Sequence, residues 1–209
     1  MTSTLRLAIV VWVCVVGCFS RFDVARYRSA TVRVVAAKSL ALVPLVVSSA
    51  PGSQINVETT PRWLDGPRTT AQLQLAERVP AEELVRGRLA TALGVATIVS
   101  PQDVDRAMDG ARPVDLDRAI PDIANRTSAD GVVVVSIKNY TARAAGLLNA
   151  EVAGDMTIAL YAPDGGLAWS LQAHVVRGPA GSNAAPSLDH FLEYAMAKFD
   201  GEVRAMATK

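Results

Sequence analysis

The sequence contains very few residues of the kinds that build cross-links and metal sites. Only two of its 209 residues are cysteine, Cys14 and Cys18, and only two are histidine, His174 and His190. Because both cysteines lie near the N-terminus, the rest of the chain has neither a disulfide nor a free thiol and must be held together by packing. Neither histidine has a second histidine or a cysteine at a metal-ligand spacing, so we predict no metal site.

The motifs that mark common enzyme classes are also absent. There is no Gly-x-Ser-x-Gly elbow, no phosphate-binding loop, no Gly-x-Gly-x-x-Gly and no His-Glu-x-x-His. Asp130 and Asp164 each precede a glycine in a turn pattern, where aspartate is favoured for backbone reasons. We therefore predict that the protein is not an enzyme and needs no cofactor. The alternative is a hydrolase that brings Asp155, His174 or His190 together in a cleft.

Charge of either sign is not in excess. The chain has 21 Lys+Arg and 20 Asp+Glu, and its formal net charge is +1. A protein that binds nucleic acid normally has a strongly basic face, so we predict no nucleic-acid partner. Nothing in the sequence indicates a small-molecule substrate. The length is suited to a single domain with a sizeable core.

What the sequence does contain is an apolar N-terminal segment. After Arg6, residues 7–19 are uncharged and mostly apolar. As a helix this run would reach only about 20 Å, against about 30 Å for the core of a bilayer, so it is too short to span. One cation before an apolar core, and the small residue Gly17 at its end, are typical of an export signal. We predict that residues 1–17 are a signal peptide.

Cys18 directly follows Gly17, and this arrangement resembles the lipobox of bacterial lipoproteins. In those proteins the cysteine receives the lipid, palmitate included, and becomes the first residue. The resemblance implies that Cys18 anchors the protein to a membrane on its periplasmic side. Phe19 follows where inner-membrane lipoproteins of enteric bacteria have aspartate, which implies the outer membrane. The alternative is a buried first strand or helix with an incidental cysteine.

Residues 18–38 are predicted to be a lipid anchor and a tether. The stretch from Arg21 to Arg33 is rich in arginine, has one acid and lacks a sustained apolar period. Its cations could rest on anionic headgroups, each contributing about 1 kcal/mol, or it could be a solvated linker. The globular domain is then expected over residues 39–209.

Apolar periodicity predicts a single α/β domain, with a mixed sheet of about five strands packed with helices. The strands are expected at 39–47, 95–99, 132–137, 152–161 and 167–176, and the helices at 69–93, 101–108, 115–127 and from 187 onward. Pro44 should lie at a bulge or an edge, and Pro80 and Pro121 should interrupt their helices. The expected core comprises Leu40, Leu42, Val133, Val135, Ile158, Leu160, Trp169, Leu171, Leu192 and Phe199.

Two long connections carry apolar or aromatic residues that a simple linker would not need. Trp63 lies in the connection 48–68, and Tyr140, Leu147 and Leu148 lie in the connection 138–150. Aromatic anchors are enriched among binding hot spots, so we predict that these four residues contact a protein partner. The alternative is that they close over the core of the domain itself.

The order of elements resembles a known domain. The segments that carry the resemblance are Leu40 to Leu45, Ala129 to Ile137 and Leu160 to Trp169. They are similar to the periplasmic lipoprotein domain shared by the curli secretion channel subunit and the lipoprotein activators of penicillin-binding proteins. These are packing and turn motifs, so no catalytic residue is carried over.

That resemblance implies a membrane-anchored scaffold or activator. Its partner would be a protein of an envelope machine, for example one for cell-wall synthesis or secretion. An envelope hydrolase, or an accessory subunit of an envelope transporter, is the alternative.

Overall fold

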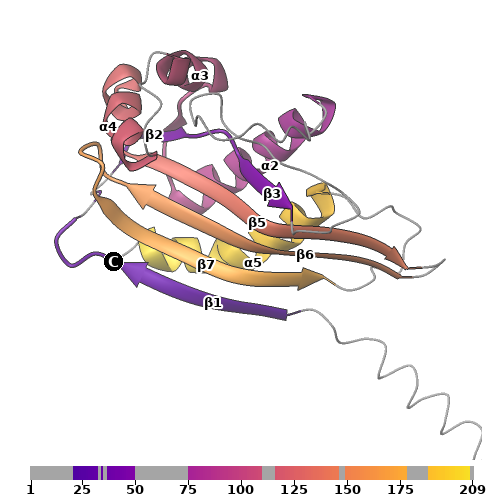
Figure 1. Cartoon of the computed structure of the whole chain (residues 1–209). Coiled ribbons are helices and arrows are strands. Elements are labelled where there is room, and N and C mark those ends of the chain that lie inside the picture. Colours follow the sequence, from indigo (N-terminus) through magenta and orange to yellow (C-terminus); the bar gives the residue numbers. More distant parts are fainter. Residues whose placement is uncertain are drawn as a thin grey trace, which may run out of the picture.

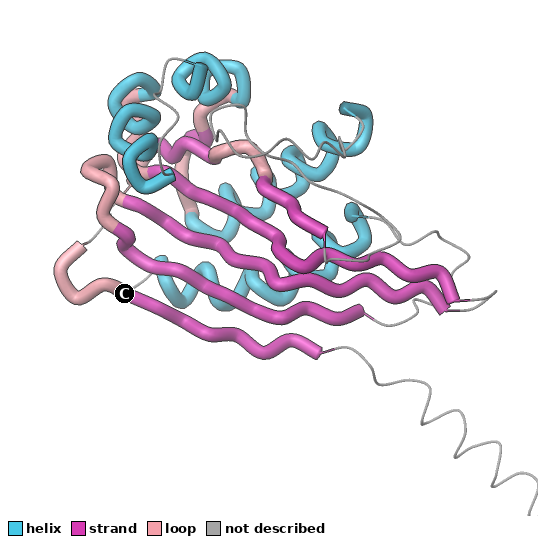
Figure 2. The backbone as a smooth tube through the Cα atoms, viewed as in Figure 1, coloured by secondary structure: helices cyan, strands magenta, loops and turns pink. Residues whose placement is uncertain are grey.

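The computed structural model describes residues 21–32, 34, 37–49, 75–109, 116–145, 149–177 and 188–207. This part of the chain folds into a seven-stranded mixed sheet with four helices (Figures 1 and 2), which confirms the predicted α/β class with two strands more than expected. The elements are β1 (Arg21–Arg28), β2 (Ser39–Leu42), β3 (Val46–Ser49), α2 (Leu75–Leu93), β4 (Thr97–Ile98), α3 (Pro101–Asp109), α4 (Leu116–Thr127), β5 (Val132–Ala145), β6 (Asn149–Tyr161), β7 (Leu167–Arg177) and α5 (Leu188–Ala207).

The sheet has the strand order β1-β7-β6-β5-β2-β4, and β3 also pairs with β5. The strands β1, β7, β6 and β5 are antiparallel, whereas β2 and β3 run parallel to β5. The predicted strand 39–47 is divided in two at Pro44, because proline cannot donate a ladder hydrogen bond. Leu42 pairs with Val133 and Val46 with Ser136, so both halves lie along the same neighbour.

The strands β5 and β6 are longer than predicted and form a hairpin. The strand expected at 132–137 continues to Ala145, so most of the expected connection 138–150 is strand. The register shifts between Lys138 and Thr141, and Asn139 in this bulge has a positive φ of 53°. Asparagine tolerates that conformation better than most residues do, and the bulge lets the strand continue past an irregular stretch.

The two expected helix interruptions are not found. The helices α2 and α4 run through Pro80 and Pro121 without a break. In α4 the buried residues Ile120, Ile123 and Ala124 share one face. Burial of such a face outweighs the single hydrogen bond that an internal proline removes.

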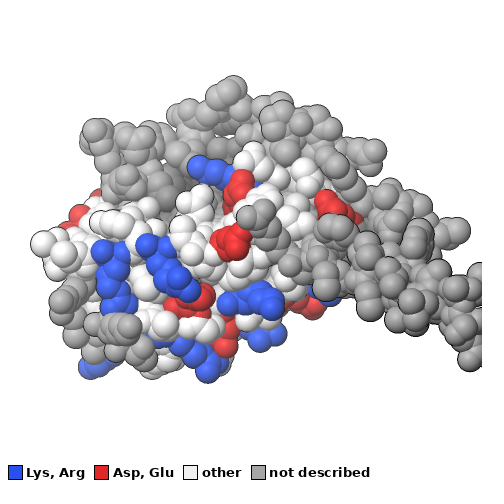
Figure 3. Space-filling view, turned by 90° about the horizontal axis from the view of Figure 1, so that it is seen from below, with Lys and Arg blue, Asp and Glu red and all other residues white. Residues whose placement is uncertain are grey.

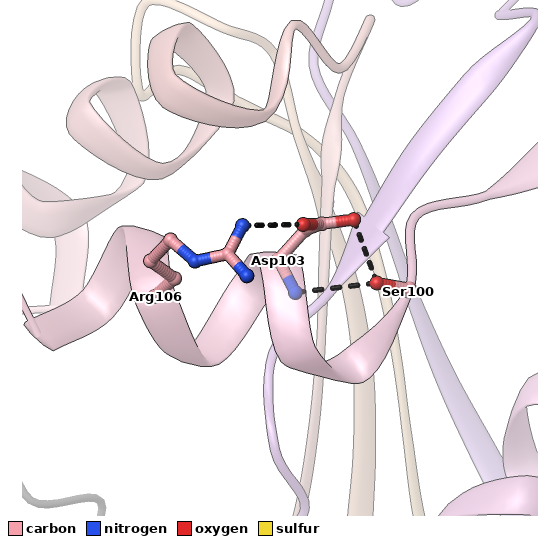
Figure 4. A network of polar contacts seen from close by, with 3 residues as sticks. All are labelled: Ser100, Asp103 and Arg106. Carbon is pink, nitrogen blue, oxygen red and sulfur yellow. Dashed lines mark hydrogen bonds and ion pairs between the residues drawn. The ribbon is translucent and has the colours of Figure 1, made fainter.

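Helix α3 begins where its cap predicts. The main-chain N–H of Asp103 donates to Ser100 Oγ over 3.2 Å, and the Ser100 hydroxyl lies 2.7 Å from Asp103 Oδ2 (Figure 4). Arg106 Nη1 donates to the other carboxylate oxygen, Asp103 Oδ1, over 2.9 Å. The Ser100 side chain therefore caps the start of the helix by accepting from the main-chain N–H of Asp103.

The two faces of the sheet are covered to different extents. Behind the sheet as drawn in Figure 1, α2 and α5 cover the larger core, which contains all ten residues predicted for it. On the other face, α3 and α4 pack near β2 and the beginning of β5. This smaller cluster includes Val104, Ile120, Ile123, Val132 and Val134.

Residues 21–28 are not a tether but the edge strand β1, which pairs with β7 over eight residues. The ring of Phe22 meets that of Phe199 edge-to-face, with centroids 5.0 Å apart. Arg26 donates two hydrogen bonds to the carboxylate of Glu202, at 2.6 and 2.5 Å, and Arg28 donates to the main-chain oxygen of Met206. The prediction was wrong because the partners of this segment lie more than 140 residues further along the chain.

Candidate functional surface on the open face of the sheet

One face of β1, β7, β6 and β5 has no described helix over most of its area (Figure 1), and we call it the open face. The strand registers assign these residues to it: Asp23, Ala25, Tyr27, Ser136, Lys138, Ala153, Asp155, Thr157, Ser170, Gln172, His174 and Val176. All of them are partly or fully exposed.

Alternation along the strands creates this face. On β6, Gly154, Met156 and Ile158 are buried toward the helices, while Asp155 and Thr157 between them point the other way. Antiparallel sheets commonly have one such solvated face. Across the strands, Asp23 pairs with His174, His174 with Asp155, and Asp155 with Lys138. The open face therefore carries a row of residues that alternate between acidic and basic.

The most organised part of this row is the Asp155 cluster, which consists of Asn139, Asp155 and His174. Asn139 Nδ2 donates to Asp155 Oδ2 over 2.7 Å. Nδ1 of His174 lies 2.7 Å from the other oxygen, Asp155 Oδ1. The bulge in β5 positions Asn139 for this contact, because its left-handed conformation re-aims the side chain.

Opposing effects act on the pKa of Asp155. Partial burial raises this pKa, but the hydrogen bonds from Asn139 and His174 and the attraction to the imidazole outweigh burial and place it below its ordinary value. The folded protein therefore stabilises the carboxylate form. An ionised Asp155 keeps the ring of His174 oriented with Nδ1 toward β6.

The ring of His174 has one nitrogen left for other molecules. Its side chain is 54% exposed, and Nε2 has no hydrogen-bond partner in the described part of the chain. Such a nitrogen can exchange a proton or form a hydrogen bond with a bound molecule. No described side chain provides a nucleophile bonded to Nε2, as a catalytic triad requires.

The hydrolase alternative required Asp155, His174 or His190 to meet in a cleft. Asp155 and His174 do meet, but on the exposed face of the sheet. His190 lies in the first turn of α5, and this helix covers the opposite face. Among the residues that the structure describes, no group of three or more His, Cys, Asp or Glu is placed to hold a metal ion.

Asp130 and Asp164 both accept hydrogen bonds from main-chain N–H groups, but only Asp164 does so within its predicted turn. Asp130 Oδ2 accepts hydrogen bonds from the main-chain N–H groups of Ser39, at 3.0 Å, and Lys38, at 2.7 Å, and these bonds lower the pKa of Asp130. Asp164 Oδ1 accepts from the N–H of Gly166 over 2.9 Å. Asp164 therefore supports its own turn, whereas Asp130 joins the segment before β5 to the start of β2.

A small notch lies between α2 and α3. Its lining includes Pro44, Glu82, Arg86, Pro101 and Asp105. It encloses about 10 Å³, which is room for one water molecule. Arg86 of α2 donates to the main-chain oxygen of Val99, in the segment that precedes α3, over 2.7 Å. The notch is too small to bind a substrate.

The predicted contact residues have different outcomes. Tyr140 is only 2% exposed, and its ring packs edge-to-face on Phe191 with centroids 5.7 Å apart. It is a core residue, as the alternative held, because the strand continues past the bulge and turns this side chain toward α5. Cys18, Trp63, Leu147 and Leu148 lie outside the described residues.

Sequence reasoning named Asp155 and His174 together only as a condition of the hydrolase alternative and did not predict that they meet. The signal was present in the turn that joins their strands, Pro163 to Gly166. Counting outward from the centre of this turn pairs Asp155 with His174, which is the register observed. Asn139 could not be found this way, because its position depends on a bulge.

Within the ranges that the structure describes, no helix is long and apolar enough to cross a membrane.

No protein-family model and no curated protein matches the sequence. The solved structures to which the chain is similar include three from different organisms. The PelC dodecamer from Paraburkholderia phytofirmans is 11% identical, with 90% of this chain and 99% of that chain covered and a TM-score of 0.49. Lipoprotein GNA1162 from Neisseria meningitidis is 13% identical, with 80% and 98% covered and a TM-score of 0.47. The LpoB C-terminal domain from Salmonella enterica is 22% identical, with 68% and 84% covered and a TM-score of 0.41. Of these three proteins, GNA1162 is named as a lipoprotein.

Proposed function

We propose that this protein is a lipid-anchored periplasmic protein that binds a protein partner of the cell envelope, as a scaffold or activator. By the sequence resemblance, the partner belongs to a machine for cell-wall synthesis or secretion. We further propose that Cys18 is the lipidated residue and that the membrane is the outer membrane.

The observation that carries the proposal is the short distance along the chain between Cys18 and the folded domain. Only Phe19 and Ser20 separate Cys18 from β1, and β1 is a full edge strand of the sheet. Three residue steps span at most about 11 Å of extended chain. A lipid on Cys18 therefore holds the domain against the membrane surface, where its reach is limited to partners in or beside the same membrane.

The open face is the surface that we propose for the partner. It carries small side chains such as Ala25, Thr157 and Ser136 beside the charged row. Protein partners can bind polar surfaces of this kind, whereas small ligands require concave pockets. Trp63, Leu147 and Leu148 remain proposed contacts for the same partner.

The anchor is tested by replacing each N-terminal cysteine in turn. In cells fed labelled palmitate, Cys18→Ser should abolish labelling and leave the protein unprocessed or released from the membrane. Cys14→Ser is the matched control, because it removes the neighbouring cysteine and should leave labelling and membrane partition unchanged. Palmitate labelling that survives Cys18→Ser would contradict the proposal.

The partner surface is tested by site-specific photo-crosslinking in intact cells. A photoreactive residue at Gln172 or Thr157 should form an adduct with a specific envelope protein, which mass spectrometry then identifies. The control position is Arg88, which is exposed on α2 at the other side of the sheet. Adducts at Arg88 alone would assign the partner to the helical side. Trp63→Ala and Leu148→Ala should reduce the adduct at Gln172 without lowering the melting temperature.

A further inference from the structure

The outer edge of β1 has main-chain groups that face away from every strand that the structure describes. The N–H of Ser29 donates to the main-chain oxygen of Ala168 over 2.8 Å. This bond shows which residues of β1 form hydrogen bonds with β7. In an antiparallel pair, alternate residues bond to the neighbouring strand and the residues between them point away from it. The odd-numbered residues of β1 therefore bond to β7. The N–H and C=O groups of Phe22, Val24, Arg26 and Arg28 point outward.

Those outward main-chain groups have no hydrogen-bond partner among the residues that the structure describes. The edge is also regular, because β1 contains no proline and its register with β7 runs from Arg21 to Arg28 without a bulge. Proteins usually protect an edge of this length with a bulge, a proline or a covering segment, since it otherwise accepts another strand. The edge is thus a template for strand addition.

The side chains along this edge favour an acidic neighbour. β1 carries three arginines and one aspartate. Arg26 is 54% exposed although it is paired with Glu202, and Arg28 bonds to a neutral carbonyl, so the charge of Arg28 is not neutralised by that contact. Figure 3 views the molecule from the β1 side and shows several basic side chains with acidic ones between them. Tyr27, 50% exposed, provides an aromatic surface for a neighbouring strand.

We propose that the outer edge of β1 binds an extended, acidic segment of a partner protein as an added strand. Main-chain hydrogen bonds from the four outward residues would supply the binding, and the arginines would select the charge of the segment. A second copy of the chain fits less well, because it would bring a second set of arginines to the same edge. The inference depends on one part of the proposed function, namely that the partner is a protein.

The direct test uses the full chain purified in detergent and two synthetic peptides. One peptide alternates glutamate and threonine, and the other alternates lysine and threonine. The acidic peptide should bind at least about tenfold more tightly than the basic one, with an affinity that falls as salt is added. Its binding should slow amide hydrogen exchange at Phe22, Val24, Arg26 and Arg28. The amides of Ala25 and Tyr27, which bond to β7, should be protected with or without peptide.

A matched set of variants tests the role of the main chain. Arg26→Pro removes an outward N–H without breaking a bond to β7, whereas Arg26→Ala removes the same side chain and keeps that N–H. The acidic peptide should bind Arg26→Pro about tenfold more weakly than Arg26→Ala, since a main-chain donor is lost and the proline ring obstructs the edge. Ala25→Pro should instead release β1 from β7 and lower the melting temperature.

Several results would overturn the inference. Equal binding of the two peptides would remove the charge selection, and equal binding to Arg26→Pro and Arg26→Ala would remove strand addition. Protection of the four outward amides that grows with protein concentration, without peptide, would make a second copy the occupant. Because the assay uses purified protein, its outcome does not depend on the palmitate or crosslinking results that test the proposed function.

Discussion

The two faces of the sheet are built from the same strands but are specified by different interactions. The face toward α2 and α5 is apolar and buried, and it includes Phe191, Phe199 and Leu171 at essentially zero exposure. The open face presents charged and small polar residues, in which Asp155 is bonded to Asn139 and His174. Hydrophobic burial is extensive on the face toward α2 and α5, so that face contributes most to stability, whereas on the other face it is confined to the part under α3 and α4. The exposed residues of the open face are free to vary with function.

The largest expected effect comes from removing a ring from the covered face. Phe199→Ala deletes a fully buried side chain that packs on Phe22 and joins α5 to β1. We expect a loss of about 3 to 5 kcal/mol in the free energy of unfolding, measured by urea denaturation. Lys198→Ala, at an exposed neighbouring position, is the control. A loss below about 1 kcal/mol for Phe199→Ala would mean that α5 is not docked on the sheet.

A pair of adjacent substitutions compares the two faces directly. At Gly154, an added Cβ would lie 3.1 Å from Cγ2 of Ile137 and 3.3 Å from the ring of Phe191. Gly154→Val should therefore destabilise the fold by about 1 to 3 kcal/mol through overpacking. Ala153→Val, one residue away on the open face, should change stability by less than about 0.5 kcal/mol. Equal effects of the two substitutions would show that the open face is packed as well.

The Asp155 cluster should make a smaller, pH-dependent contribution. Because the pKa of Asp155 is lowered on folding, its contribution is present above the ordinary aspartate pKa of about 4 and is lost as the pH falls through the folded value. Compared with the wild type, Asp155→Asn should lose up to about 1 kcal/mol at neutral pH and little in acid.

The control for this prediction is Asn139→Gly, which keeps the backbone conformation at φ 53° and removes one hydrogen bond to the carboxylate. It should move the pKa of Asp155 toward its ordinary value, as followed by NMR titration of the carboxyl group. No movement would mean that Asn139 does not stabilise the charge.

The smallest effect is expected in the neutral part of the open face. Gln172→Ala removes an exposed side chain that pairs with Thr157 and Ala25 across the strands. The melting temperature should be nearly unchanged, since surface substitutions of this kind stay within about 0.5 kcal/mol. A clear drop in melting temperature would indicate that another part of the chain covers this face.

Much of the fold was predictable because its signals are local. Alternation in 152–161 and 167–176, with a Pro-Asp-Gly-Gly turn between them, predicted a hairpin that corresponds to β6 and β7. The helical spacing of Leu188, Leu192, Ala195 and Phe199 predicted the buried face of α5. The candidate surface was less predictable: its polar residues were visible one by one, but the contact of Asn139 with Asp155 depends on a bulge.

The sequence by itself determined the covered face, because apolar periodicity and turn residues act over a few neighbouring positions. Only the tertiary structure decided that Arg21–Arg28 is a strand. Taken alone, this segment has too little apolar character to fold. It becomes β1 because β7 offers an unpaired edge and α5 brings Phe199 and Glu202 to Phe22 and Arg26. Phe199 and Glu202 lie about 175 residues away from Phe22 and Arg26 in the sequence. No local sequence pattern can predict a contact over that separation.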